Sequence, residues 1–499
     1  MEHVDVLIVG AGLSGIGAAC HLQAQCPTKS YAILEARETI GGTWDLFRYP
    51  GIRSDSDMYT LGYSFRPWRQ DKSIADGSDI REYVRDTARE HAVEEHIRFQ
   101  HRVIRAEFSS EEARWSVQAQ RTDTGETVAL SCDFLLMCSG YYRYDEGYSP
   151  EFEGIERFVG EVVHPQHWPE DLDYADKRVV VIGSGATAVT LVPAMAADAA
   201  HVTMLQRSPS YVLSLPAVDP IAKLLRRVLP ENRAYALVRW KNVLLATAIY
   251  QLSRRRPGFV KGLIRKGLER QLPAGYDIDT HFKPRYDPWD QRLCLVPDGD
   301  LFAALAAGSA SIATDTIDTF TERGIRLSSG AELDADVVVT ATGLNLLLLG
   351  GTEFVVDGRP VDLSQTMAYK GMMLSGIPNM AMALGYTNAS WTLKCDLTCE
   401  YVCRLLNHMD AAGYRICTPE NSDPSVREQP LIDFSSGYVL RAIDRLPKQG
   451  SKTPWRLHQN YARDIVSLRR SPIEDGAMRF ARAPVSRPAP PREPEPVGA

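Results

Sequence analysis

The apolar and polar positions near the N-terminus follow a strand–helix–strand pattern. The apolar run VDVLIV leads into GAGLSG, a helix-like stretch follows, and a second apolar run, YAILE, ends at Glu35. In such a βαβ unit Gly10 turns the chain, Gly12 allows the backbone to approach a pyrophosphate, and Gly15 allows the helix to pack on the strand. Glu35 stands 20 residues after Gly15, where a carboxylate can accept hydrogen bonds from ribose hydroxyls. The pattern predicts a dinucleotide site, with a purely structural turn as the alternative.

The same pattern returns further along the chain, where RVVVI is followed by GSGATA, a helix-like stretch and VTMLQR. Gly183 and Gly185 take the first two glycine positions and Ala188 takes the third. The second strand runs into Arg207 and Ser208 instead of an acid, and an arginine pairs with a 2′-phosphate that a carboxylate would repel. This site is predicted to prefer NADPH over NADH; the alternative is a solvated arginine at a strand end. The predicted contacts are Gly183, Ser184, Gly185, Thr187, Ala188, Arg207 and Ser208.

Two further apolar runs that end in glycine, CDFLLMCSG and ADVVVTATG, suit crossings of the chain between two domains. We therefore expect an α/β fold with two Rossmann-like dinucleotide-binding domains, one inserted in the other, and a helical insert. The expected order is an FAD-binding domain at 1–143 and 342–482, an NADPH-binding domain at 144–215 and 291–341, a helical insert at 216–290 and a disordered tail at 483–499.

Residues 221–270 look helical and are rich in Lys and Arg, with only Glu231 and Glu269 as acids. We expect these helices to cap the site. Because Trp240 and several aliphatic residues lie among the cations, the insert is also a candidate for peripheral contact with an anionic membrane surface or for self-association. A solvated basic face is the simpler interpretation.

Composition narrows the range of partners and cellular locations that the chain can have. The chain has 499 residues, 44% of them apolar, and a net charge of −7, so nucleic acid is not an expected partner. Nine cysteines without a CxxC pair fit a reducing compartment, and Cys395, Cys399 and Cys403 are expected to pack as small apolar side chains rather than to bind metal. No signal-peptide pattern and no apolar run of about 20 residues is present, so we expect a cytoplasmic protein.

The segment FVGEVVHPQHWP precedes the second glycine turn and matches the pattern F-x-G-x-x-x-H-x-x-x-W-P. This pattern resembles the fingerprint of Baeyer–Villiger monooxygenases, which are class B flavoproteins; N-hydroxylating relatives usually lack the Trp-Pro ending. The matching residues are Phe158, Gly160, His164, Trp168 and Pro169.

A second pattern of that family, [A/G]-G-x-W-x4-[F/Y]-P-[G/M]-x3-D, resembles GGTWDLFRYPGIRSD. Its glycines would lie against a flavin together with Thr43, and Trp44 would pack on the flavin ring system. Asp55 would hold an arginine in place. The matching residues are Gly41, Gly42, Trp44, Tyr49, Pro50, Gly51 and Asp55.

The resemblance implies a catalytic arginine, and Arg292 in DPWDQRL holds that position, oriented by Asp55. A guanidinium stabilises anions without deprotonating; the alternative is a surface Asp–Arg pair. His164 would position the two domains, and Trp455 is a weaker candidate for an NADP contact. The Met-rich segment at 367–380 is expected to fill core rather than to line a pocket.

The implied activity is that of an enzyme that uses FAD, NADPH and O2. Through a flavin C4a-peroxide it converts ketones to esters or lactones and oxidises sulfides or thioamides, without a metal. Two alternatives stay open: an NADPH oxidase or N-hydroxylating flavin monooxygenase, and a non-catalytic nucleotide-binding redox sensor.

Overall fold

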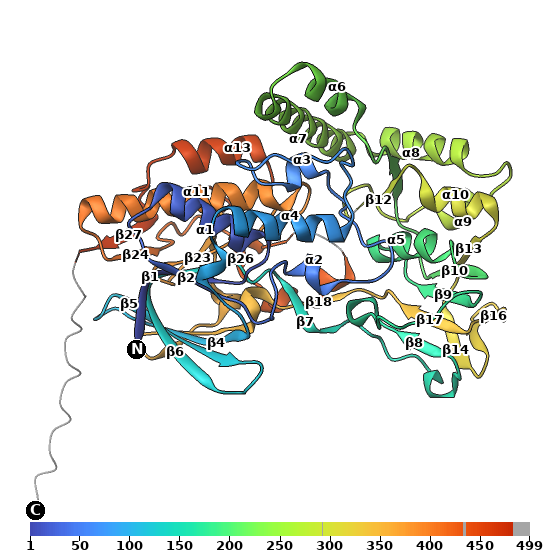
Figure 1. Cartoon of the computed structure of the whole chain (residues 1–499), viewed down its shortest axis with the longest axis horizontal. Coiled ribbons are helices and arrows are strands. Elements are labelled where there is room, and N and C mark those ends of the chain that lie inside the picture. The colour runs from blue at the N-terminus through green and yellow to red at the C-terminus, as the bar shows by residue number, and fades with distance from the viewer. Residues whose placement is uncertain (292, 433–435, 483–499) are drawn as a thin grey trace, which may run out of the picture.

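The computed structural model describes residues 1–291, 293–432 and 436–482 of the chain. Arg292 and the tail predicted to be disordered, 483–499, lie outside the described residues. Two β-sheets lie side by side, each covered by helices (Figure 1). We call the larger sheet with its helices the first unit and the smaller one with its helices the second unit.

The first unit contains, within the described residues, a nine-stranded sheet of mixed direction. Its parallel part holds both predicted N-terminal strands, in a register that places Val6 opposite Tyr31. In the antiparallel part of the sheet, the strand Arg114–Arg121 alternates buried and more exposed residues, because one face of this part meets solvent. The strands are β1 (Glu2–Val9), β2 (Tyr31–Leu34), β3 (Ile97–Arg98), β4 (His101–Ser109), β5 (Arg114–Arg121), β6 (Thr127–Met137), β19 (Glu353–Val356), β20 (Arg359–Pro360) and β23 (Met380–Met382).

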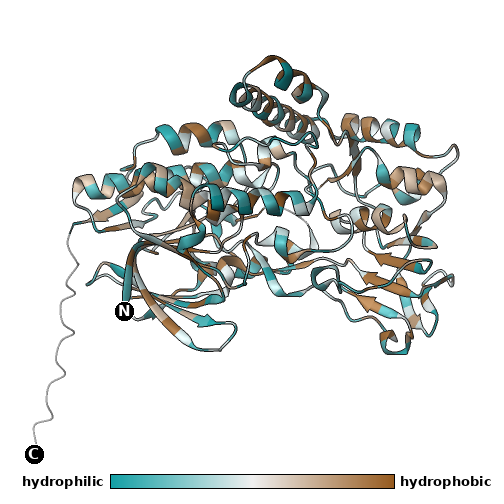
Figure 2. Cartoon of the chain, viewed as in Figure 1, coloured by the Kyte–Doolittle hydropathy of each residue, from teal (hydrophilic) through white to brown (hydrophobic). Residues whose placement is uncertain are grey.

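The second unit is built on an all-parallel sheet that has five strands among the described residues. Its central strands carry buried valine runs, at 179–181 and 337–339, as expected where both faces are covered, and Figure 2 shows this sheet largely in brown. The α/β fold class with two Rossmann-like units is therefore confirmed, whereas the domain boundaries stay a prediction. The strands are β8 (Glu161–Val163), β9 (Arg178–Ile182), β10 (His201–Gln206), β13 (Ala310–Thr314) and β17 (Val337–Thr340).

The two units are joined by a short antiparallel pair in which Tyr142 faces Leu346. A second pair is parallel and leads to the cavity described below. The two named pairs are β7 (Tyr142–Gly147) with β18 (Leu344–Leu346) and β11 (Val212–Leu215) with β12 (Cys294–Pro297), and the three-stranded sheet is β14 (Ile317–Thr321), β15 (Gly324–Leu327) and β16 (Glu332–Asp334). The remaining pairs are β21 (Ala368–Tyr369) with β22 (Met373–Leu374), β24 (Ile416–Pro419) with β27 (Met478–Ala481) and β25 (Glu428–Pro430) with β26 (Lys448–Gly450).

Helices cover both sheets, and α6 to α9 lie in the predicted insert. The helices are α1 (Leu13–Gln25), α2 (Thr43–Leu46), α3 (Met58–Leu61), α4 (Gly77–Glu90), α5 (Ala186–Met195), α6 (Pro220–Val228), α7 (Glu231–Arg255), α8 (Pro257–Gln271), α9 (Ile278–His281), α10 (Asp300–Ala307), α11 (Trp391–Ala412), α12 (Gly437–Leu440) and α13 (Tyr461–Ile465). No helix in the described ranges is both long and apolar enough to cross a bilayer.

The core contains the two groups of side chains that were predicted to pack there. Cys395, Cys399 and Cys403 are buried in the core of the first unit, where they pack along α11 as predicted. The methionines of the segment 367–380 are also buried there or beside it, with Met372 and Met373 fully inaccessible. Both groups therefore fill core.

The insert is anchored to both units. Tyr235 and Val238 on α7 pack in the core of the first unit, whereas Val260 and Ile264 on α8 pack in the core of the second. Figure 1 shows α6 and α7 at the top of the molecule, above the junction of the two units. The insert therefore spans the junction.

A buried arginine fixes this anchor. Arg239 on α7 is 7% exposed and donates hydrogen bonds to the carbonyls of Tyr59 (2.8 Å) and Gly62 (2.7 Å). It also donates to Asp396 on α11, at 3.3 Å. Burial acts to raise the pKa of Asp396, but the contact with His21 and the charge of Arg239 outweigh it, and the pKa lies below its usual range. Asp396 is therefore a buried anion that needs its cation.

We expect Arg239→Met to destabilise the protein by about 3 kcal/mol, because it leaves the Asp396 carboxylate buried with one cation fewer. The measurement is thermal unfolding followed by circular dichroism. Arg233→Met is the matched control, since Arg233 is exposed on the same helix and makes no ion pair with the described part of the chain. Equal melting temperatures for the two variants would contradict the anchoring role.

Candidate active site

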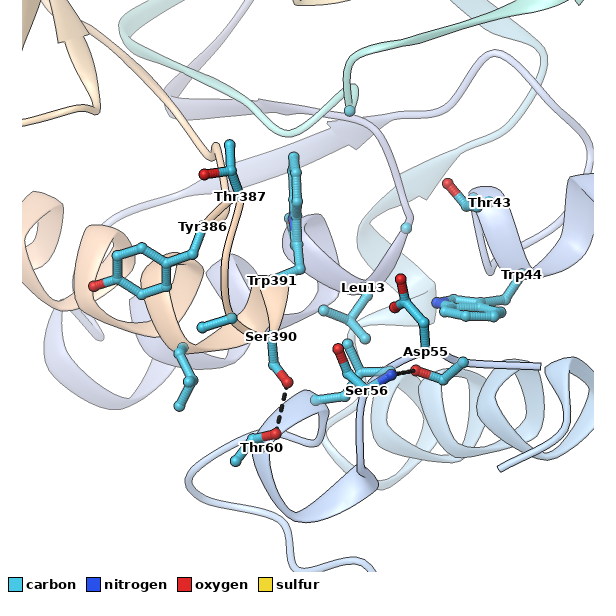
Figure 3. A pocket seen from close by; sticks show the side chains of 18 of the residues that line it. Leu13, Thr43, Trp44, Asp55, Ser56, Thr60, Tyr386, Thr387, Ser390 and Trp391 are labelled. Atoms are coloured by element: carbon cyan, nitrogen blue, oxygen red, sulfur yellow. Dashed lines mark hydrogen bonds between the residues drawn. The ribbon is translucent and has the colours of Figure 1, made fainter. Parts of the chain in front are cut away.

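A cavity of about 950 Å³ lies against the N-terminal glycine turn, and α7 forms its far side. Figure 3 shows Thr43, Trp44 and Asp55 on one side of the cavity, Tyr386, Ser390 and Trp391 on the other, and Leu13 between them. Three segments distant in sequence therefore meet at one site.

The N-terminal glycine turn opens directly onto this cavity. Gly10 has a φ of +106°, and a Cβ there would lie 2.6 Å from the carbonyl oxygen of Cys138. A Cβ on Gly15 would lie 1.8 Å from the carbonyl oxygen of Gly10, so only glycine lets α1 pack this close to the turn. α1 begins after Gly12 with no side-chain cap and no acid in its first turn. Its free N–H groups can therefore receive an anion.

Glu35 lies at the end of β2, where it is 6% exposed and borders the cavity. Its two carboxylate oxygens accept hydrogen bonds from the backbone N–H groups of Ala11 (2.6 Å) and Arg37 (2.9 Å). Burial raises the pKa of Glu35. The carboxylate thus braces the glycine turn, and its remaining lone pairs can still accept from a ligand hydroxyl.

Residues 41–57, which we call the bridging loop, begin at the cavity wall. Gly42 has a φ of +57°, and a Cβ there would lie 3.0 Å from the Cα of Gly12. The hydroxyl of Thr43 lies 3.3 Å from that of Tyr144, and Trp44 lines the cavity beside them. The loop backbone and the N-terminal glycine turn are therefore in direct contact.

The middle of the bridging loop does not face the cavity. Phe47 and Tyr49 are buried in the core of the second unit. Arg53, whose side chain is 9% exposed, forms an ion pair with Asp300 on α10, with Nη2 and Oδ1 3.3 Å apart. These apolar and charged residues therefore hold the second unit against the first.

The end of the bridging loop returns to the cavity at Asp55. Asp57 then caps α3 by accepting from the N–H of Thr60 at 3.1 Å, and it also accepts from the side chain of Asn242 on α7 at 2.7 Å. Because Arg292 lies outside the described residues, its predicted pairing with Asp55 stays a prediction.

The opposite wall, residues 386–391, was assigned no role from sequence. Trp391 donates from Nε1 to Ser14 Oγ at 2.9 Å and stacks on Tyr141 with ring centroids 5.0 Å apart. Ser390 Oγ lies 2.6 Å from Thr60 Oγ1 (Figure 3). Asn388 Oδ1 is buried and has no hydrogen-bond partner among the described residues. The mixed aromatic and polar segment GYTNASW is the signal that would have marked it as a site wall.

The second glycine turn lies outside the cavity and is open to solvent. Gly183 has a φ of +146°, and a Cβ there would lie 2.4 Å from the carbonyl oxygen of Ala341, whereas a Cβ on Gly185 would meet nothing within 4 Å. α5 begins after Gly185 with no side-chain cap. Arg207 and Ser208 are exposed just beyond β10. The other predicted contacts lie nearby, with Ser184 Oγ 3.0 Å from Ser210 Oγ, Thr187 half-buried and Ala188 buried.

The fingerprint residues do not line the cavity: His164 lies where the units join, whereas Phe158 and Trp168 pack within the second unit. His164 follows β8 and packs against the end of β7, since a Cβ on Gly147 would lie 1.9 Å from its ring. Burial lowers the pKa of His164, which favours the neutral ring. A Cβ on Gly160 would lie 2.3 Å from the carbonyl oxygen of Asp336, so the chain passes tightly against the second sheet here. Phe158 is buried, and Trp168 and Pro169 are half-buried.

Trp455 corrects one expectation. It is 2% exposed and packs edge-on against Tyr369, with ring centroids 5.6 Å apart, in the core of the first unit. A side chain enclosed in this way has no free face for a nucleotide. We therefore do not retain Trp455 as an NADP contact.

Fold and site together describe an α/β protein with two dinucleotide-type glycine turns, one at a large cavity and one open to solvent, and comparison with known proteins agrees. The sequence model of the flavin-binding monooxygenase-like family matches residues 4–348. The chain belongs to this family. It is 61% identical over 484 residues to the FAD-containing monooxygenase EthA of Mycobacterium tuberculosis, an alignment that covers 97% of this chain and 99% of the relative. The resemblance to flavoprotein monooxygenases is thus confirmed.

Other relatives and solved structures agree with this assignment. The EthA protein of Mycolicibacterium smegmatis is 54% identical over 96% of this chain and 98% of its own length. The solved structure of oxidized steroid monooxygenase bound to NADP has a TM-score of 0.76 at 22% identity, covering 96% of this chain and 99% of that one. Cyclohexanone monooxygenase from Rhodococcus sp. Phi1, bound to NADP+, has a TM-score of 0.70 at 20% identity, covering 84% and 86%. Both structures share the fold.

The two glycines of the second turn give a matched test. Gly183→Ala is expected to destabilise the protein by about 2 kcal/mol, because its Cβ meets backbone at a strained φ. Gly185→Ala is expected to cost less than about 1 kcal/mol, since its Cβ enters open space. Thermal unfolding of both variants measures the difference. Equal destabilisation would show that Gly183 is not held against Ala341.

Proposed function

We propose that the protein is an FAD-dependent, NADPH-consuming monooxygenase of the Baeyer–Villiger type, which uses O2 to convert ketones to esters or lactones and to oxidise sulfides or thioamides. The observation that carries the proposal is the open N-terminus of α1 facing a cavity whose far end, at β11 and α7, carries apolar side chains such as Leu213, Val243 and Leu245. A phosphate-binding end and an apolar end in one cavity suit a flavin nucleotide with a small organic substrate beside it.

The residues around the cavity fit FAD. The free N–H groups after Gly12 suit a pyrophosphate, and Glu35 suits ribose hydroxyls. Ser139 Oγ and Asn388 Oδ1 line the cavity and are buried without a partner among the described residues, so a polar ligand would satisfy them. The relative that is 61% identical is named as FAD-containing.

The residues of the second turn fit NADPH. Arg207 is exposed and makes no ion pair with the described residues, so its guanidinium is available for a 2′-phosphate. Ser208 can donate to the same phosphate, and the open space at Gly185 leaves room for a pyrophosphate at the start of α5.

FAD, when bound, supplies the redox chemistry by taking a hydride from NADPH and passing one oxygen atom of O2 to the substrate. In our proposal Arg292 stabilises negative charge that develops during oxygen transfer, and Asp55 orients it. Trp44, which lines the cavity, would pack on the bound cofactor and keep water from it. His164, neutral at the junction, positions the second unit over the cavity.

The partners in this proposal are O2 and a small ketone or sulfur compound. The cytoplasmic location inferred from the sequence remains a prediction. Two rival functions predict different stoichiometries: an oxidase releases one hydrogen peroxide per NADPH, and a redox sensor does not turn NADPH over. Both glycine turns and Asp55 are in place in the described part of the chain, which argues against a non-catalytic sensor. The Trp168-Pro169 ending of the fingerprint favours the monooxygenase over the oxidase.

Arg207→Ala is expected to raise the KM for NADPH roughly 10-fold or more, the effect of losing a hydrogen bond to a charged group. The KM for NADH should change less than about twofold, since NADH has no 2′-phosphate, and Arg207→Lys should lose less than the alanine variant. Steady-state kinetics with both coenzymes measure this. An equal rise for NADPH and NADH would contradict the role of Arg207.

Arg292→Ala is expected to keep oxidising NADPH but to form no ester or sulfoxide, releasing hydrogen peroxide instead. Product, peroxide and NADPH are quantified in the same reaction with a methyl ketone and with an aryl sulfide. The wild type should form close to one product per NADPH, and so should Arg285→Ala, a change at an exposed position in the same segment.

Normal product formation by Arg292→Ala would refute its assignment. A wild type that returns one peroxide per NADPH with every ketone and sulfide tested would instead establish the oxidase.

A further inference from the structure

The insert exposes far more apolar surface than the rest of the chain. Of the 19 large hydrophobic residues that are exposed in the described ranges, 13 lie between Leu215 and Leu263. Scattered apolar residues need no explanation, but a concentration of this kind marks an interaction surface. We define the docking face as the exposed residues of α6, α7 and α8. They are Ile221, Leu224, Val228, Leu237, Trp240, Leu244, Leu245, Ile249, Leu252, Phe259 and Leu263.

The spacing of these residues places them on continuous helix faces. On α6 they recur at positions i, i+3 and i+7, with Val228 66% exposed at the end. On α7 Leu237 and Leu244 are seven residues apart, on the side away from the buried Arg239. Figure 2 shows brown and teal mixed along α6 and α7, which stand at the top of the molecule away from both sheets.

Cations that form no ion pair with the described part of the chain lie on the same helices as this apolar surface. Several basic residues of the insert are paired with acids from elsewhere in the chain, such as Arg226 with Asp71 and Arg254 with Asp290, which the local charge count did not anticipate. The rest are exposed and make no ion pair with described residues. They are Lys223, Arg227, Arg233, Arg255, Arg256, Lys266 and Arg270.

The docking face is continuous with the cavity. Leu215, Ile221, Leu245 and Ile249 are each at least 40% exposed, and each also lines the cavity. These side chains form an apolar rim between β11, α6 and α7. An apolar molecule can therefore follow these side chains from the docking face into the cavity.

We propose that the docking face binds the surface of an anionic lipid bilayer, and that a lipid-soluble substrate enters the cavity from the bilayer through this rim. The entry step rests on the proposed monooxygenase function, whereas the bilayer contact does not. Helices with apolar residues inserted below the headgroups and Lys or Arg beside them bind anionic membranes in this way.

Charge favours a bilayer over a second copy of the chain. In a twofold dimer through this face, the unpaired cations of one copy would meet the same cations of the other. Anionic headgroups would neutralise them instead.

The test is flotation of the full-length, FAD-loaded protein with vesicles of phosphatidylcholine alone or mixed with phosphatidylglycerol at 3:1. We expect the protein to float with the anionic vesicles at 50 mM salt. We expect several-fold less flotation at 500 mM salt, where charges are screened, and with neutral vesicles.

Matched variants separate the apolar and the ionic contributions to vesicle binding. Leu224→Glu with Leu244→Glu should abolish flotation, whereas Val159→Glu should not, since Val159 is 82% exposed next to β8, at the opposite edge of the molecule (Figure 1). Arg227→Gln with Arg233→Gln should weaken flotation at least threefold, and Arg359→Gln, an exposed arginine on β20, should leave it unchanged.

Turnover tests the entry step. The Leu224→Glu, Leu244→Glu variant should oxidise a water-soluble ketone at the wild-type rate but a long-chain ketone held in anionic vesicles about 10-fold more slowly. Equal rates for both ketones would overturn the entry step, even if flotation holds. If neither ketone is oxidised by the wild type, the proposed function fails while flotation still decides the contact.

Absence of flotation at 50 mM salt, or flotation that survives the paired glutamates, would overturn the bilayer contact. A dimer in light scattering that the same glutamates dissociate, with no flotation, would overturn it in favour of self-association.

Discussion

The geometry of the cavity depends on the bridging loop, because this one segment contacts every part that must be aligned. Gly42 packs on Gly12 at the start of α1, and Phe47 and Tyr49 enter the core of the second unit. Arg53 and Asp57 then tie the loop to α10 and α7. An error in any of these contacts would move the second unit and the insert relative to the glycine turn. Close packing makes such interfaces rigid rather than adjustable.

The first unit, the second unit and the insert each contribute a different feature. The first unit holds a helix N-terminus and a braced carboxylate at the cavity, and the second unit presents its own open helix N-terminus at the surface. The insert supplies the apolar end of the cavity and is locked in place by Arg239. None of the fingerprint residues lines the cavity: His164 packs where the units join, and Phe158 packs inside the second unit.

Sequence predicted those features whose cause is local. Gly15 and Gly183 were recognisable because a glycine turn requires close backbone approach within a few residues of sequence. The roles of Phe47, Tyr49 and Arg53 were not, because their partners are distant; Asp300 is 247 residues from Arg53. For the same reason a charge count within the insert overlooked the pairing of Arg226 with Asp71, and a motif match at Trp455 could not reveal that the side chain is enclosed. Local sequence patterns identified the nucleotide-binding turns. Packing between residues far apart in the sequence determined which side chains line the cavity.

The central claim is that one oxygen atom of O2 is transferred to an organic substrate. The most direct measurement supplies the FAD-loaded protein with NADPH, a methyl ketone and ¹⁸O2, and analyses the ester by mass spectrometry. The account predicts one ¹⁸O atom in the ester, at the oxygen between the carbonyl carbon and the migrated group. An ester without the label, or label found only in hydrogen peroxide, would contradict it.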